Sequence, residues 1–163
     1  MNGANENGLQ AAQTMTVLNR LLALLRYSLA SYLRYARPWT RPGNARLLEA
    51  VRRVTADHEA HARRVGELIL KRRGKIEPAG FPVRFTAYND LALDYLAGLL
   101  VAHERTIVEE LARCAAGLDR DPEAKRLAAD ILASERRHLR TLTALVSPAA
   151  RKETSYPAAG VAA

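Results

Sequence analysis

The sequence predicts an all-α fold in which four long helices form a bundle of two antiparallel hairpins joined by a long crossover. Apolar residues recur every three or four positions over four long stretches, which is the pattern of helices with one buried face. Gly and Pro gather between these stretches, and no alternation typical of strands competes with them. At 163 residues the chain suits one domain with a substantial core. We expect the bundle at 11–147, a flexible arm at 1–10 and a flexible tail at 148–163.

The first predicted helix covers residues 14–36. Its apolar stripe includes Leu18, Leu22 and Leu29, and a cluster containing two prolines follows the helix. Arg26 lies four residues after Leu22 and three before Leu29. In a continuous helix this spacing places Arg26 on or beside the buried face.

The second predicted helix covers residues 45–71 and carries two histidines on its inner face. His58 lies seven residues after Val51, and His61 lies seven after Val54. Seven residues are close to two helical turns, so both imidazoles share the face of the apolar stripe.

The segment 71–83 contains Gly and Pro repeatedly, so it cannot be helical throughout. Thirteen extended residues reach about 43 Å, which is enough to return along a long helix. The second and third helices should therefore be parallel. The third helix is predicted at 86–116, with Glu104 in its apolar stripe and His103 on the flank or at an interface.

The fourth predicted helix starts at Asp121-Pro122, where Asp is an N-cap and Pro occupies the first turn. It closes at Ser147. Glu135 and His138 sit one turn apart inside its apolar stripe. A carboxylate and an imidazole on a buried face are costly unless something compensates them.

The two predicted hairpins share a spacing. Glu104 and Glu135 are 31 residues apart, and a histidine follows Glu135 by three. Arg26 and His58 are 32 apart, and a histidine follows His58 by three. Folding the hairpins together predicts one polar layer made of Arg26, His58, His61, Glu104, Glu135 and His138.

This arrangement resembles the ferritin-like superfamily of di-iron carboxylate proteins, which place Glu on the first and third helices and Glu-x-x-His on the second and fourth. The runs at 18–22, 28–33 and 88–96 are similar to bacterioferritin-like members, and the resemblance covers roughly residues 10–146. It implies two metals bridged by carboxylates and oxygen-dependent oxidation of ferrous iron.

Carried over by position, the resemblance makes Glu104, Glu135 and His138 ligands of one metal. His61 matches the histidine of the other metal. Two family glutamates are replaced, one by Arg26 and the bridging one by His58. The haem-binding methionine of bacterioferritin falls at Glu59, so no haem is expected.

The substitutions change the expected chemistry, because two carboxylates remain where the family has four. A second divalent ion beside the permanent charge of Arg26 should be unfavourable by several kcal/mol. We expect at most one Fe, Mn or Zn ion, held by Glu104, Glu135 and His138, with His58 as a fourth ligand. Arg26 would substitute for the second cation.

Several alternatives stay open. They are a metal-free structural or stress-associated bundle with a buried Arg-Glu-His network, a basic DNA-associating bundle, and an active di-iron ferroxidase. Full ferroxidase activity is not expected, and residual iron-dependent oxidoreductase activity stays open. The net charge of +8 permits nucleic-acid binding, but Arg pairs at 52–53 and 63–64 fit a solvated face better.

The sequence also bears on location and assembly. It holds no long apolar run and no signal-like N-terminus, so we expect no membrane association. Its single cysteine, Cys114, fits a packed thiol in a reducing cytoplasm. The metal ion is the expected partner, and among oligomers a homodimer is favoured.

Overall fold

The structure is a computed structural model, and it describes residues 3–146. The predicted all-α class is confirmed over this part of the chain, which contains five α-helices and two short 3₁₀ helices. In chain order these are α1 Gly3–Arg26, α2 Leu29–Ala36, η1 Pro42–Asn44, α3 Ala45–Lys71, η2 Val83–Tyr88, α4 Leu93–Ala116 and α5 Pro122–Val146. Among the described residues, no helix is long and apolar enough to cross a membrane.

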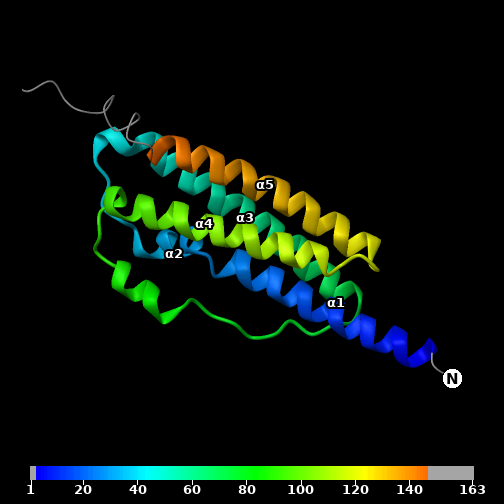
Figure 1. Cartoon of the computed structure of the whole chain (residues 1–163). Helices are drawn as coiled ribbons and strands as arrows, with labels where there is room; N and C mark the ends of the chain where they lie inside the picture. The colour runs from blue at the N-terminus through cyan, green and yellow to red at the C-terminus, as the bar shows by residue number, and fades with distance from the viewer. Residues whose placement is uncertain (1–2, 147–163) are drawn as a thin grey trace, which may run out of the picture.

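The long helices lie side by side as a bundle (Figure 1). α1 and α2 follow each other along one edge, and α3 returns beside them. The segment between α3 and α4 then runs back along the length of the bundle, so α3 and α4 point in the same direction, as expected. α5 returns antiparallel to α4 and also packs against α3.

The bounds of α3, α4 and α5 show how far local sequence determines this fold. The predicted bounds of the second helix match α3, Ala45–Lys71. At the start of α5, the Asp121 carboxylate accepts a hydrogen bond from the Ala124 amide at 3.0 Å, so the predicted N-cap is confirmed. α4 begins at Leu93 rather than at 86, because Asp90 adopts a left-handed conformation with φ 64° and separates η2 from α4.

The first helix differs from its prediction in two ways. α1 begins at Gly3, so residues 3–10 continue the helix instead of forming a separate arm. The helix then breaks at Tyr27–Ser28: Ser28 has extended backbone, and its Oγ accepts a hydrogen bond from the Ser31 amide at 3.1 Å. This serine caps α2 and ends the continuous 14–36 helix. The predicted tail at 148–163 lies outside the described residues.

The apolar core is divided into two clusters along the bundle. One cluster surrounds Leu25, Val65 and Ile107, and the other surrounds Leu29, Val54 and Leu100. Along α1–α2, α3 and α4, the boundary between the clusters falls where the sequence carries polar side chains. Buried polar residues therefore occupy a layer between two apolar halves, where water is excluded. Cys114 is a buried free thiol in the first cluster, as expected.

Candidate metal centre

Three side chains from three helices meet in the layer between the apolar clusters. His58 comes from α3, Glu104 from α4 and Glu135 from α5, and each is 0% exposed. One ligand atom from each residue lies within 4.8 Å of the other two. We call these three residues the buried cluster. Because each one stands on a separate rigid helix, the bundle itself holds the three donors together.

Most carboxylate oxygens of the buried cluster lack a hydrogen-bond donor. Glu135 Oε2 lies 2.9 Å from His58 Nε2. Glu135 Oε1 and both oxygens of Glu104 have no hydrogen-bond partner in the part of the chain that the structure describes. An unpaired buried carboxylate is costly, since it has lost its water without a replacement. A cation placed among these oxygens would compensate for that loss, so the donor set fits a metal ion.

A chain of hydroxyl groups determines which nitrogen of His58 carries a proton. Ser31 Oγ donates to the Leu25 carbonyl at 3.2 Å, because a carbonyl can only accept. Ser28 Oγ must then donate to Ser31 Oγ, 2.9 Å away, which uses its only proton. The contact of 2.9 Å between Ser28 Oγ and His58 Nδ1 therefore requires a proton on Nδ1.

This assignment leaves Nε2 of His58 as the ligand atom. In the neutral imidazole, a protonated Nδ1 means that Nε2 carries a lone pair, and Nε2 faces the carboxylate of Glu135. Two acceptors at 2.9 Å repel each other unless a proton or a metal ion lies between them. Orientation of a metal-binding histidine through its other nitrogen is the usual arrangement around protein-bound metals.

The surroundings shift the pKa values of Glu104 and His58. Burial raises the pKa of Glu104 from 4.5 to about 7, because the ionised form loses its hydration. Burial alone lowers the pKa of His58. The hydrogen bond with Glu135 and the charges of Glu135, Glu104 and Asp57 act in the opposite direction, and the net result is a raised pKa. A metal ion must therefore displace protons from this site.

Arg26 does not lie in the polar layer, so its predicted role as a substitute cation is wrong. Its side chain is exposed, and it forms no ion pair with either glutamate in the described residues. The inner stripe of α1 is centred on Leu21 and Leu25, which are both 0% exposed. Position 28 lies seven residues after Leu21 and three after Leu25, so it continues that stripe. The side chain at position 26 points away from the stripe. Ser28 occupies the inner position instead.

Arg26 instead borders a hollow of about 470 Å³ together with Arg63 and Tyr35. His58 contributes to the wall of the same hollow. Ser28 was not among the predicted site residues, although its spacing from Leu21 and Leu25 indicates a position on the buried face. The residue was read as part of a continuous helix.

The other two histidines lie outside the buried cluster. His138 Nε2 is 2.9 Å from Asp57 Oδ2 and 3.4 Å from Ser134 Oγ. Its ring therefore contacts these two residues and is not part of the buried cluster. His61 is half-buried, and neither of its ring nitrogens has a hydrogen-bond partner among the described residues. Burial lowers the pKa of His61, which favours the neutral ring. The structure therefore gathers three of the five predicted ligands.

His103, the neighbour of Glu104, packs within the chain. Its ring lies edge-on to Phe85 with centroids 5.4 Å apart, and burial lowers its pKa to about 4. It is therefore a neutral packing residue between α4 and η2.

No model of a known protein family matches this chain, and neither a characterised protein nor a solved structure matches it in the comparisons. The function therefore has to be inferred from the side chains themselves. Two carboxylates and one imidazole are ligands that suit Fe(II), Mn(II) or Zn(II). The two negative charges balance the charge of one divalent ion.

Proposed function

We propose that this chain is a ferritin-like bundle that binds one divalent transition-metal ion through His58, Glu104 and Glu135. The observation that supports this most is that ligand atoms of three fully buried residues lie within 4.8 Å of one another, while three carboxylate oxygens of the two glutamates have no hydrogen-bond partner among the described residues. Ser28 contributes by holding the His58 ring in the ligating tautomer.

The two carboxylates limit the site to one divalent ion. Glu104 and Glu135 neutralise one divalent charge, and a second ion beside His61 would share the same two groups. Arg26 does not contribute to this limit, because its side chain is exposed. An iron ion would supply redox chemistry at this site, whereas a zinc ion would act only as a Lewis acid.

The test is metal stoichiometry after complete removal of metal with a chelator. The protein is loaded separately with Zn(II), Mn(II) and anaerobic Fe(II), and bound metal is measured by elemental analysis. We expect one equivalent per chain, and we expect Glu104→Gln to bind at least tenfold more weakly. Glu109→Gln is the matched control, since Glu109 lies on the same helix but is exposed. Two equivalents would contradict the single-ion site and favour a ferroxidase.

Zero equivalents would favour the metal-free alternative. The observation behind that alternative is the 2.9 Å contact between His58 and Glu135, which a protonated imidazole would make as a buried ion pair. The predicted network would then lack its arginine.

A DNA-associating bundle is tested separately by a gel shift at several salt concentrations. Arg52, Arg53 and Arg63 are exposed, and Arg64 pairs with Asp130. Binding through such groups must weaken steeply with salt.

A further inference from the structure

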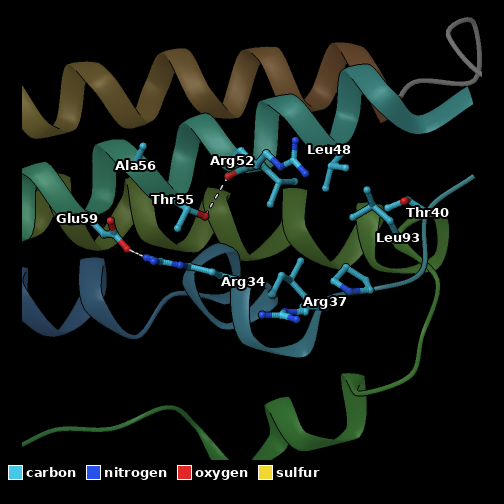
Figure 2. Close-up of a pocket in the computed structure, with 12 residues that line it drawn as sticks. Arg34, Arg37, Thr40, Leu48, Arg52, Thr55, Ala56, Glu59 and Leu93 are labelled. Atoms are coloured by element: carbon cyan, nitrogen blue, oxygen red, sulfur yellow. Dashed lines mark hydrogen bonds and ion pairs between the residues drawn. The ribbon is translucent and has the colours of Figure 1, made fainter. Parts of the chain in front are cut away.

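A second hollow lies between α2 and α3, and Thr40 lies at one end of it (Figure 2). Its volume is about 680 Å³, within the range of small-molecule pockets. None of the residues of the buried cluster lines it. A function for this pocket is therefore independent of the proposed metal site.

The pocket is strongly basic. Figure 2 shows Arg34 and Arg37 on the α2 side and Arg52 on the α3 side. Arg34 pairs with Glu59, the only acidic residue among those that line the pocket. Arg37 and Arg52 form no ion pair within the described residues, so the pocket carries an excess of two positive charges. Guanidinium groups in such a setting bind carboxylate or phosphate, often through two parallel hydrogen bonds.

The rest of the lining is largely apolar. Leu33, Val51 and Leu93 lie beneath the wall and are at most 6% exposed, so they close the pocket against the core. Leu48 and Pro38 are half-buried and provide the accessible apolar surface. A small inorganic anion would leave this surface exposed to water, whereas an apolar chain attached to the anion would cover it. The lining thus matches a ligand with one anionic end and one apolar end.

We infer that this pocket binds an organic anion with an apolar body, whose carboxylate or phosphate head interacts with Arg37 and Arg52. The apolar body lies along Leu48 and Pro38, which are the half-buried apolar residues of the lining. The Arg34–Glu59 pair borders the pocket without adding net charge.

Calorimetry with four probes of equal chain length tests both parts of this recognition. The probes are octanoate, octyl phosphate, 1-octanol and octylammonium. We expect saturable binding of one octanoate or octyl phosphate per chain, and the tighter of the two identifies the preferred head group. The neutral and cationic probes should bind at least tenfold more weakly. Decanoate should bind up to about tenfold more tightly than octanoate, because two further methylene groups are buried.

A pair of double variants locates the site. Arg37→Gln with Arg52→Gln should weaken octanoate binding at least tenfold. Arg105→Gln with Arg126→Gln removes the same charge from exposed positions on α4 and α5, and it should change binding less than twofold.

Three results would overturn the inference. They are equal binding of octanol and octanoate, equal losses in the two double variants, and the absence of saturable binding. The metal stoichiometry of the protein enters none of these measurements, so failure here leaves the metal proposal unaffected.

Discussion

Replacing Glu104 by Gln should make the metal-free protein more stable at high pH. Glu104 is 0% exposed, and burial raises its pKa from 4.5 to about 7. The folded state therefore prefers the protonated acid. Its contribution to stability is fully present below pH 4.5, and it is lost as the pH rises through 7. Glutamine keeps the shape of the side chain and carries no charge at any of these pH values.

The size of the effect follows from the difference between the two pKa values. A rise from 4.5 to about 7 corresponds to about 3 kcal/mol, at about 1.4 kcal/mol for each pKa unit. Between pH 5 and pH 8 the free energy of unfolding of the wild type should thus fall by up to about 3 kcal/mol more than that of Glu104→Gln. The pKa of His58 is also raised, partly by the charge of Glu104, so the part of its pH dependence that comes from Glu104 is absent in Glu104→Gln.

Urea denaturation of chelator-treated protein at pH 5, 6, 7 and 8 measures this difference. Glu109→Gln is the control, because Glu109 is exposed and its replacement should leave the pH dependence of the wild type unchanged. The reasoning is refuted if Glu104→Gln and the wild type lose stability in parallel over this range.

Adding metal should offset most of this difference in stability. A ligand at one hundred times its dissociation constant stabilises the folded state by about 2.7 kcal/mol. Zn(II) should therefore stabilise the wild type at pH 8 and have little effect on Glu104→Gln. Equal stabilisation of both proteins would mean that the ion binds elsewhere.

Three further perturbations test other parts of the structure. Ser28→Ala should weaken Zn(II) binding about tenfold or more in calorimetry, since His58 loses the group that fixes its tautomer. The same change removes the cap of α2 and should cost about 1 kcal/mol in urea denaturation. Arg26→Gln should leave the metal stoichiometry and affinity unchanged within twofold, because Arg26 is exposed; a second bound equivalent would restore its discarded role. Asp121→Ala should lower the free energy of unfolding at pH 7 by about 1–2 kcal/mol, since Asp121 caps α5 and pairs with Arg72. The hydrogen bond with Arg72 lowers the pKa of Asp121 below 3.8, so this loss should shrink as the pH falls below that value; a loss that persists at pH 2 would contradict the assignment.

Periodicity and turn chemistry predicted most of the helical architecture. The span of α3, the capped start of α5 and the parallel course of α3 and α4 all follow from local signals and from the length of the Gly/Pro-rich segment. Such signals are reliable because a long apolar stripe has only one way to be buried in a bundle. The placement of His58, Glu104 and Glu135 on inner faces follows from the same periodicity.

The contents of the polar layer were only partly predictable. In a continuous helix, positions 26 and 28 lie about 200° apart, so only one of them can face inward. The spacing from Leu22 and Leu29 favours Arg26, and the spacing from Leu21 and Leu25 favours Ser28. The structure has Ser28 buried at the helix break and Arg26 exposed. Likewise, spacing put His138 near Glu135, but the nearby Asp57 on α3 determines where its ring lies.

The sequence by itself thus determined that this chain forms a helical bundle and that two glutamates and a histidine are buried in it. Only the tertiary structure decided that a serine, and not an arginine, completes the layer. The physical reason is that a guanidinium can reach water from the end of α1, whereas the hydroxyl of Ser28 meets the His58 ring only when α2 and α3 are packed together.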